Sequence, residues 1–200
     1  MKRLVLALAA VLPLPALATP PPTLDIHFVL HQDVQMNEQD FVSEHVSAWL
    51  GHMRSEVVPG QDIRIHVHRQ WEDLELTPYG YDRALHDWAR RAGPVADRLA
   101  VDRRAIRMVL VTQGAPTGGN VLGIAFAGDR FAMASVRNAN TVAHELGHTL
   151  GAVHGDVERW AFCDTMMTDP QLFRWPCEVY SKANQARIRR YLDEGVFDRD

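Results

Sequence analysis

Three histidines and one glutamate lie within the eleven residues HELGHTLGAVH at positions 144–154. His144 and His148 are four residues apart, so on a helix both imidazoles project from one face and can bind the same metal ion. Glu145 directly follows the first histidine, so its carboxylate can reach a water molecule beside the metal rather than the metal itself. This spacing predicts a catalytic metal site with a neighbouring general base.

The third histidine requires a change of chain direction. A catalytic zinc site has three protein ligands and one open position. His154 lies six residues after His148, and a continued helix would carry it about 9 Å further along the axis. Gly151 lies where the chain must turn back, because glycine adopts a positive φ without a Cβ clash. We therefore predict that His144, His148 and His154 bind one Zn²⁺ ion. Three later carboxylates are alternative third ligands without this spacing: Asp156, Asp164 and Glu178.

The strands that must position this motif follow from the hydrophobic pattern. Alternating or continuous apolar runs predict strands at residues 23–30, 62–71, 105–112, 121–128 and 130–136. In the second strand His66 and His68 share a face, which we expect to be solvated; a metal site there is the alternative. The loop at 113–120 is rich in glycine but lacks the phosphate-binding pattern.

Four helices are expected around these strands. The first spans residues 37–53 and the second runs from Thr77-Pro78 to about residue 91, ending at Gly93-Pro94, with a short helical piece to about residue 101. The motif helix is capped by Asn138 or Asn140 and is packed to the core by Val142, Leu146 and Leu150. The last helix runs from Ser181 to about Leu192. This order predicts an α+β fold, a mixed sheet with helices packed on it.

The histidine motif and a later methionine resemble those of a known protein family. HELGHTLGAVH matches the metzincin signature H-E-x-x-H-x-x-G-x-x-H. The methionine that metzincins place beneath the zinc ion resembles Met167 in CDTMMTD, with Met166 as the alternative. The resemblance implies a twisted sheet of about five strands with an antiparallel edge strand, an active-site helix and a C-terminal helix. It also implies that GIAFA (123–127) is the edge that pairs with bound peptide.

The residues agree with one branch of this family in some features and depart from it in others. The helix predicted between the second and third strands is similar to the adamalysin (reprolysin) branch, but Gly155 stands where adamalysins usually have Asp directly after the third histidine. Asp169 stands where astacins and serralysins have an additional tyrosine ligand, so we expect no such ligand. With no cysteine before the motif helix, a cysteine-switch propeptide is excluded.

The first 18 residues have the pattern of a signal peptide. Lys2 and Arg3 precede an apolar run at 4–12, and Ala16-Leu17-Ala18 is a cleavage site. A membrane anchor is the alternative, but the run falls short of the roughly 20 residues that span a bilayer. We therefore expect residues 19–200 to form a single catalytic domain, secreted or periplasmic, with no membrane association after cleavage.

The net charge limits which partners are expected, and the cysteine content predicts one cross-link. The formal charge is −4 and becomes −6 when two basic residues leave with the signal peptide. A mildly acidic chain without a basic cluster argues against nucleic acid as a partner, and we expect a monomer. Cys163 and Cys177 are predicted to form a disulfide after export, worth about 3 kcal/mol by loop entropy; free thiols or metal ligands are the alternative.

Together these features predict a zinc-dependent endopeptidase acting on protein or peptide substrates. Glu145 would activate water for attack on the peptide carbonyl and pass the proton to the leaving amine, while Met167 forms the floor of the site. Two other classes of protein share these residues. One is a non-catalytic zinc-containing binding module on a peptidase scaffold, which would have no need for Glu145. The other is an amidase acting on non-protein amide bonds.

Overall fold

The computed structural model describes residues 23–72, 74, 76, 78–168 and 175–198. The predicted signal peptide, Thr77 and Asp169 lie outside these residues. The strands are β1 (Leu24–Leu30), β2 (Ile63–His68), β3 (Ile106–Thr112), β4 (Gly123–Ala125), β5 (Phe131–Ser135), β6 (Cys163–Asp164) and β7 (Trp175–Pro176). The α-helices are α1 (Glu38–Phe41), α2 (Ser47–His52), α3 (Ala84–Leu99), α4 (Thr141–Thr149) and α5 (Lys182–Glu194).

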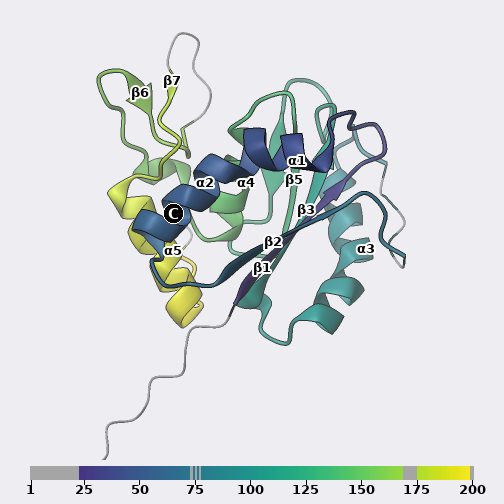
Figure 1. The fold of residues 1–200 in the computed structure, drawn as a ribbon, viewed down its shortest axis with the longest axis horizontal. Helices are drawn as coiled ribbons and strands as arrows, with labels where there is room; N and C mark the ends of the chain where they lie inside the picture. Colours follow the sequence, from purple (N-terminus) through teal and green to yellow (C-terminus); the bar gives the residue numbers. More distant parts are fainter. Residues whose placement is uncertain (1–22, 73, 75, 77, 169–174, 199–200) are drawn as a thin grey trace, which may run out of the picture.

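The main sheet has five strands in the order β2-β1-β3-β5-β4. The first four are parallel, and β4 pairs antiparallel with β5 at one edge. Every residue of β3 is buried, as its continuous apolar sequence predicts for a strand covered on both faces. The predicted α+β fold, a five-stranded mixed sheet with an antiparallel edge strand, is therefore confirmed (Figure 1).

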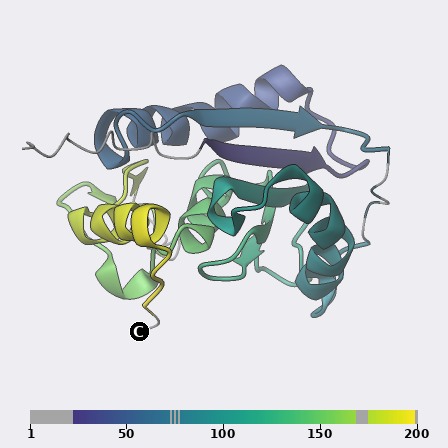
Figure 2. The ribbon, with the colours of Figure 1, turned by 90° about the horizontal axis from the view of Figure 1, so that it is seen from below.

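Helices cover both faces of this sheet. On one face α3 packs through Trp88, whose indole N–H donates to the carbonyl of Met108 at 3.1 Å. The other face is covered by the N-terminal helical segment, α4 and α5, and the buried core there includes Phe28, Trp49 and Leu146. Figures 1 and 2 both place α5 beside the end of the N-terminal helical segment, although the two are far apart in sequence.

The first helical segment is longer than predicted and is not a uniform α-helix. It runs without a break from Glu38 to Val57, and its α-helical parts alternate with two π-helical turns, η1 (Val42–Val46) and η2 (Met53–Val57). Asn37 caps its start, accepting from the amide of Asp40. A π turn shifts the side chains that follow it around the helix axis, so His52, Met53 and Val57 join Phe41 and Trp49 on the buried side.

The prediction for the second helix is wrong at both ends. It begins at Ala84 rather than at the Thr77-Pro78 dipeptide, and it continues through Gly93 and Pro94 to Leu99. The residues before it are engaged elsewhere: the amide of Gly80 donates to the carbonyl of Pro116 at 2.7 Å, and the Tyr79 hydroxyl accepts from the amide of Gly114. Packing of Trp88, Val95 and Ala96 on the sheet outweighs the helix-breaking tendency of Pro94.

Two histidines predicted to lie on a solvated strand face are partly buried instead. His66 and His68 of β2 gather around His27 of β1, and the His27 and His66 rings stack with centroids 4.4 Å apart. Trp71 lies over His68 with ring centroids 4.2 Å apart. The carboxylate of Asp25 binds His66 at 2.8 Å. These contacts account for the partial burial of His66 and His68.

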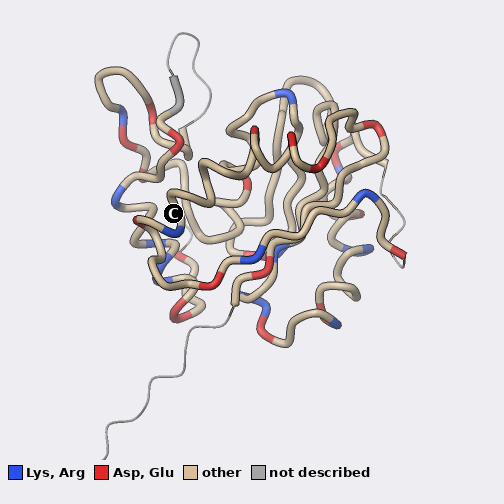
Figure 3. The backbone as a smooth tube through the Cα atoms, in the orientation of Figure 1, with Lys and Arg blue, Asp and Glu red and all other residues tan. Residues whose placement is uncertain are grey.

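A small arm with strands β6 and β7 projects from the helical side (Figure 1). A disulfide between Cys163 and Cys177 holds the two strands together. Phe162, the residue directly before β6, is 87% exposed. Acidic and basic residues are both spread over the described backbone (Figure 3). Within the described residues, no helix is both long and apolar enough to span a membrane.

Candidate metal centre

The helix α4 presents the first half of the histidine motif. Val142, Leu146 and Leu150 have no exposed surface and face the core, as predicted. Asn140 occupies the N-cap position, but its side chain makes no capping bond; Asn138 instead accepts from the amide of Asn140 at 2.9 Å. The buried stripe therefore orients the helix, and His144 and His148 lie on its half-exposed side.

Gly151 ends α4 in the conformation that its position predicts. Its φ is +92°, a value that residues with a Cβ rarely adopt. Its amide donates to the carbonyl of His148 at 3.1 Å, and the amide of Ala152 donates to Gly147 at 2.9 Å, which closes the last helical turn. The chain then turns back, and His154 begins a short 3₁₀ turn, η4 (His154–Asp156).

This return brings the three imidazoles together. The Nε2 atom of His154 lies 3.0 Å from Nε2 of His144 and 3.0 Å from Nε2 of His148. Two nitrogens bound to one tetrahedral zinc ion at 2.0–2.1 Å would stand about 3.3 Å apart. Among the residues that the structure describes, these three histidines are the one group of three or more potential ligands that converge in this way.

The hydrogen bonds of the outer ring nitrogens favour metal binding. Nδ1 of His144 lies 2.8 Å from the carbonyl of Met166, and Nδ1 of His148 lies 3.2 Å from that of Ala152. A carbonyl can only accept, so each Nδ1 carries the proton and each Nε2 presents a lone pair. Lone pairs on neighbouring nitrogens repel unless a cation lies between them. The donor set and its supporting bonds therefore fit a zinc ion.

The alternative third ligands lie in other environments. The carboxylate of Asp156 forms an ion pair with Arg187. Glu178 is exposed, with a left-handed backbone at φ 52°. Asp164 is buried in the arm, where its carbonyl accepts from the amide of Cys177 at 2.8 Å. None of them belongs to the converging group, so the structure places His154 beside the helical pair instead.

Glu145 belongs to α4, and its side chain lies between this helix and the edge strand β4. Its side chain is only 5% exposed, and burial raises its pKa to about 8. A cation held by the neighbouring imidazoles would act in the opposite direction and favour the carboxylate. The carboxyl group rests against Gly123 of β4: a Cβ built there would stand 2.5 Å from Cγ and 2.6 Å from Cδ of Glu145.

The two adjacent methionines make different contacts with α4. The backbone carbonyl of Met166 holds the ring of His144. The side chain of Met167 is fully buried, and its Sδ would lie 2.5 Å from a Cβ at Gly147 of α4. Met167 therefore packs against the helix that carries two of the histidines.

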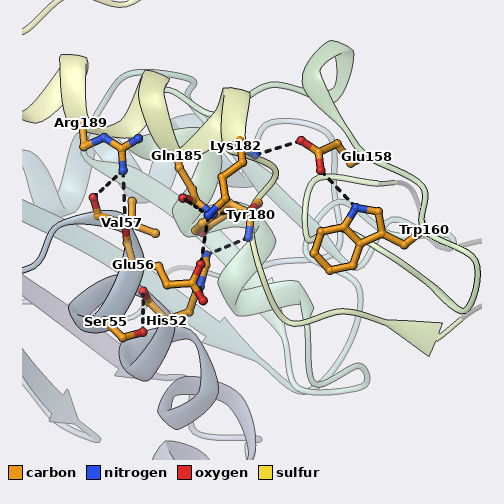
Figure 4. Close-up of polar contacts among 10 residues, drawn as sticks. All are labelled: His52, Ser55, Glu56, Val57, Glu158, Trp160, Tyr180, Lys182, Gln185 and Arg189. Carbon is orange, nitrogen blue, oxygen red and sulfur yellow. Dashed lines mark hydrogen bonds and ion pairs between the residues drawn. The ribbon is translucent and has the colours of Figure 1, made fainter.

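One supporting residue gave no signal in the sequence. Tyr180 is buried before α5, and its hydroxyl donates to the carbonyl of Ala143 at 2.7 Å while accepting from the indole of Trp49 at 2.9 Å. Its backbone amide donates to Nε2 of His52 at 3.0 Å (Figure 4). Burial raises the pKa of this hydroxyl, which keeps it protonated. No sequence motif and no hydrophobic periodicity indicates that Tyr180 contacts the helix at Ala143.

Comparisons with known proteins bear on the fold. No protein family and no curated protein sequence matches the chain. Among solved structures, metalloproteinase-II from Bacteroides fragilis is similar, with a TM-score of 0.58, 20% identity and coverage of 88% of this chain and 55% of that one. A chain from a chaperone–substrate complex has the same TM-score at 12% identity, covering 88% of this chain and 34% of its own length.

These similarities establish the kind of fold and no more. The chain spans about half and about a third of the lengths of the two solved chains. At such low identity the shared feature is the arrangement of sheet and helices. Function must therefore be argued from the histidine group and Glu145.

Proposed function

We propose that this protein is a zinc-dependent endopeptidase. The observation that carries the proposal is the convergence of three Nε2 atoms, from His144, His148 and His154. Glu145, the residue that follows His144, adds a buried carboxyl group. A purely structural zinc site fills its fourth position with a protein ligand, whereas a catalytic site leaves it open beside a general base. Three histidines with an adjacent glutamate meet the catalytic description, and the similar fold of a metalloproteinase supports it.

The metal ion and the protein would supply different parts of the catalytic chemistry. A zinc ion held by the histidines would supply a Lewis acid that polarises the peptide carbonyl and lowers the pKa of water. Glu145 takes a proton from the attacking water and delivers it to the leaving amine. The low exposure of Glu145 keeps bulk water from competing for that proton. Met167 provides an apolar support for α4 and exchanges no protons.

The edge strand β4 is the proposed binding place for an extended peptide. β4 ends the sheet, so one of its sides faces away from β5. A peptide added there as a further strand would gain backbone hydrogen bonds. Gly123 of β4 lies against Glu145, so a peptide on this edge would run past the carboxyl group. Of the predicted edge at 123–127, the strand itself covers Gly123–Ala125.

The finer assignments belong to the same proposal. We assign the chain to the metzincin group on the signature and the position of Met167. The helix α3 between β2 and β3 favours the adamalysin layout. Secretion or periplasmic export, a monomeric state, the absence of nucleic-acid partners and the absence of membrane attachment rest on the sequence features described above.

The test compares Glu145→Ala with the parent and with Glu44→Ala, which removes an exposed carboxylate from η1. Zinc content is measured on each protein, and each is incubated with a mixed peptide library with and without chelator. We expect Glu145→Ala to keep its zinc and lose cleavage by at least about 10²-fold, while Glu44→Ala cleaves like the parent.

Each of the other outcomes would contradict the proposal and point to a specific alternative. Full cleavage by Glu145→Ala would remove Glu145 from the mechanism. Bound zinc without cleavage of any peptide would identify a non-catalytic zinc module. Hydrolysis of non-peptide amides alone would identify an amidase. Peptide cleavage that survives complete zinc removal would exclude metal-dependent catalysis.

A further inference from the structure

An asparagine of the last helix holds the backbone just before His154. The side chain of Asn184 on α5 is fully buried. Its Oδ1 accepts from the amide of Val153 at 2.8 Å, and its Nδ2 donates to the carbonyl of the same residue at 3.0 Å. One amide side chain thus satisfies both backbone groups of Val153, as a neighbouring β-strand would. This fixes the peptide plane on either side of Val153.

The same helix also holds the chain just after His154. Asp156, the last residue of η4, has its carbonyl bound by the hydroxyl of Ser181, and its carboxylate pairs with Arg187. Ser181, Asn184 and Arg187 follow one another at three-residue intervals, so they lie on one side of α5. Residues on both sides of His154 are therefore attached to a single helix face.

His154 is carried by a different element from the other two histidines. His144 and His148 belong to the helix α4. His154 is exposed and lies in a three-residue 3₁₀ turn after the chain reversal. Its distance to the other Nε2 atoms is therefore set by where residues 153–156 are held.

The opposite side of α5 is itself firmly attached (Figure 4). The guanidinium of Arg189 donates to the carbonyl of Val57 at 3.0 Å, and Lys182 forms an ion pair with Glu56 at 3.2 Å. These contacts join α5 to the N-terminal helical segment, so α5 is a fixed support for the loop that it holds.

We propose that Asn184 is a positioning residue for metal binding: through Val153 it places His154 against the helical pair, and Ser181 and Arg187 assist it through Asp156. This inference rests on the proposed zinc site. It adds a residue from a helix 30 positions further along the chain, one whose side chain hydrogen-bonds the backbone of Val153. Supporting bonds of this kind typically change metal affinity by 10- to 100-fold.

The test replaces Asn184 with alanine and compares it with Gln185→Ala. Gln185 is a matched control because it is also a buried amide on α5, but it bonds Tyr180 instead of the 153–156 loop. Zinc affinity is measured by competition with a chelator of known affinity, at a temperature where circular dichroism shows that all metal-free proteins are folded. Amide hydrogen exchange of Val153 is measured on the metal-free proteins.

We expect Asn184→Ala to bind zinc about 10- to 100-fold more weakly than the parent and to exchange the Val153 amide faster. Gln185→Ala should stay within about threefold of the parent affinity and keep that amide protected. Parent-like affinity in Asn184→Ala, or an equal loss in both variants, would overturn the inference. A parent that binds zinc but cleaves nothing would refute the peptidase and leave this result standing. A parent that binds no zinc would refute both zinc proposals.

Discussion

Gly123 of the edge strand lies directly against the carboxyl group of Glu145 on the motif helix. A Cβ at position 123 would stand 2.5 Å from Cγ of Glu145 and closer still to one carboxyl oxygen, well inside van der Waals contact. The backbone of Gly123 does not have a positive φ, so its conformation is open to other residues. The missing side chain is therefore explained by the space that Glu145 occupies.

Replacing Gly123 with alanine should displace Glu145 without removing it. The flexible carboxyl end is what must move, since the strand backbone is held by β5. A displacement of about 1 Å at a catalytic group can lower the rate by about 10²-fold. We expect Gly123→Ala to keep its zinc content and lose peptide cleavage by about that factor, as measured by kcat on a peptide that the parent cleaves.

Gly93→Ala is the control for the loss of a glycine. A Cβ at Gly93 meets nothing within 4 Å, and the residue lies inside α3, far from the motif in the chain. Alanine there gains helix propensity but places a Cβ next to the ring of Pro94, and it should leave cleavage unchanged. Parent-like kcat in Gly123→Ala would show that Glu145 needs no free space at this edge.

The disulfide of the arm should contribute to stability and to the metal centre together. Cys163 and Cys177 are 14 residues apart, and closing a loop of this size is worth about 3 kcal/mol on the chain-entropy estimate. Met166 lies inside the loop, and its carbonyl holds the ring of His144. The double variant Cys163→Ser/Cys177→Ser should lower the free energy of unfolding in urea by about that amount.

Reduction provides the matching control for the cysteine variant. The parent protein treated with a thiol reductant should unfold at the same urea concentration as the double serine variant, and the variant itself should not respond to reductant. If the variant matched the oxidised parent in both unfolding and zinc retention, the disulfide would have no role in holding the arm.

The centre of the site was predictable because its rules are local. The four-residue spacing of His144 and His148 depends only on helix geometry, and the end of the helix at Gly151 depends on the freedom of one backbone dihedral. The strands were predictable for a similar reason: alternating residues mark β2, and a continuous apolar run marks β3 as a strand buried on both faces. These features follow from residues close together in sequence.

What the sequence did not reveal depends on contacts between distant segments. Asn184 makes two hydrogen bonds to the backbone of Val153, and Tyr180 makes one to that of Ala143; such bonds leave no periodic pattern. The start of α3 was predicted wrongly for the same reason, because distant contacts hold the preceding residues: Gly80 and Tyr79 are hydrogen-bonded to the loop around residue 115. Tertiary pairing there outweighed the helix-start signal of Thr77-Pro78.

The histidines at the β1–β2 edge give the fold a dependence on pH that is separate from the metal centre. His27 is 7% exposed, and its Nδ1 lies 3.1 Å from Nε2 of His68. Burial, followed by repulsion from His66 and His68, lowers the pKa of His27 to about 4, and Asp25 opposes this only in part. Burial also lowers the pKa of His68.

The sign of the effect follows from proton uptake. The ordinary pKa of histidine is about 6.5, so between pH 6.5 and 4 the unfolded chain binds a proton at His27 that the folded chain does not. The free energy of unfolding must therefore fall as the pH is lowered through this window. The full contribution of His27 is present above pH 6.5, and about 3 kcal/mol is lost on reaching pH 4.

Replacing His27 with phenylalanine should remove this contribution while keeping a flat ring beside His66. We expect the loss of stability between pH 7 and pH 4 to be smaller in His27→Phe than in the parent by about 3 kcal/mol, measured by urea unfolding. Both proteins should be metal-free, because protonation of ligand histidines would release zinc in the same range. A nuclear magnetic resonance titration of the parent should give a midpoint near 4 for the His27 ring. An unchanged pH dependence in His27→Phe, or a midpoint near 6.5, would show that this cluster does not resist protonation.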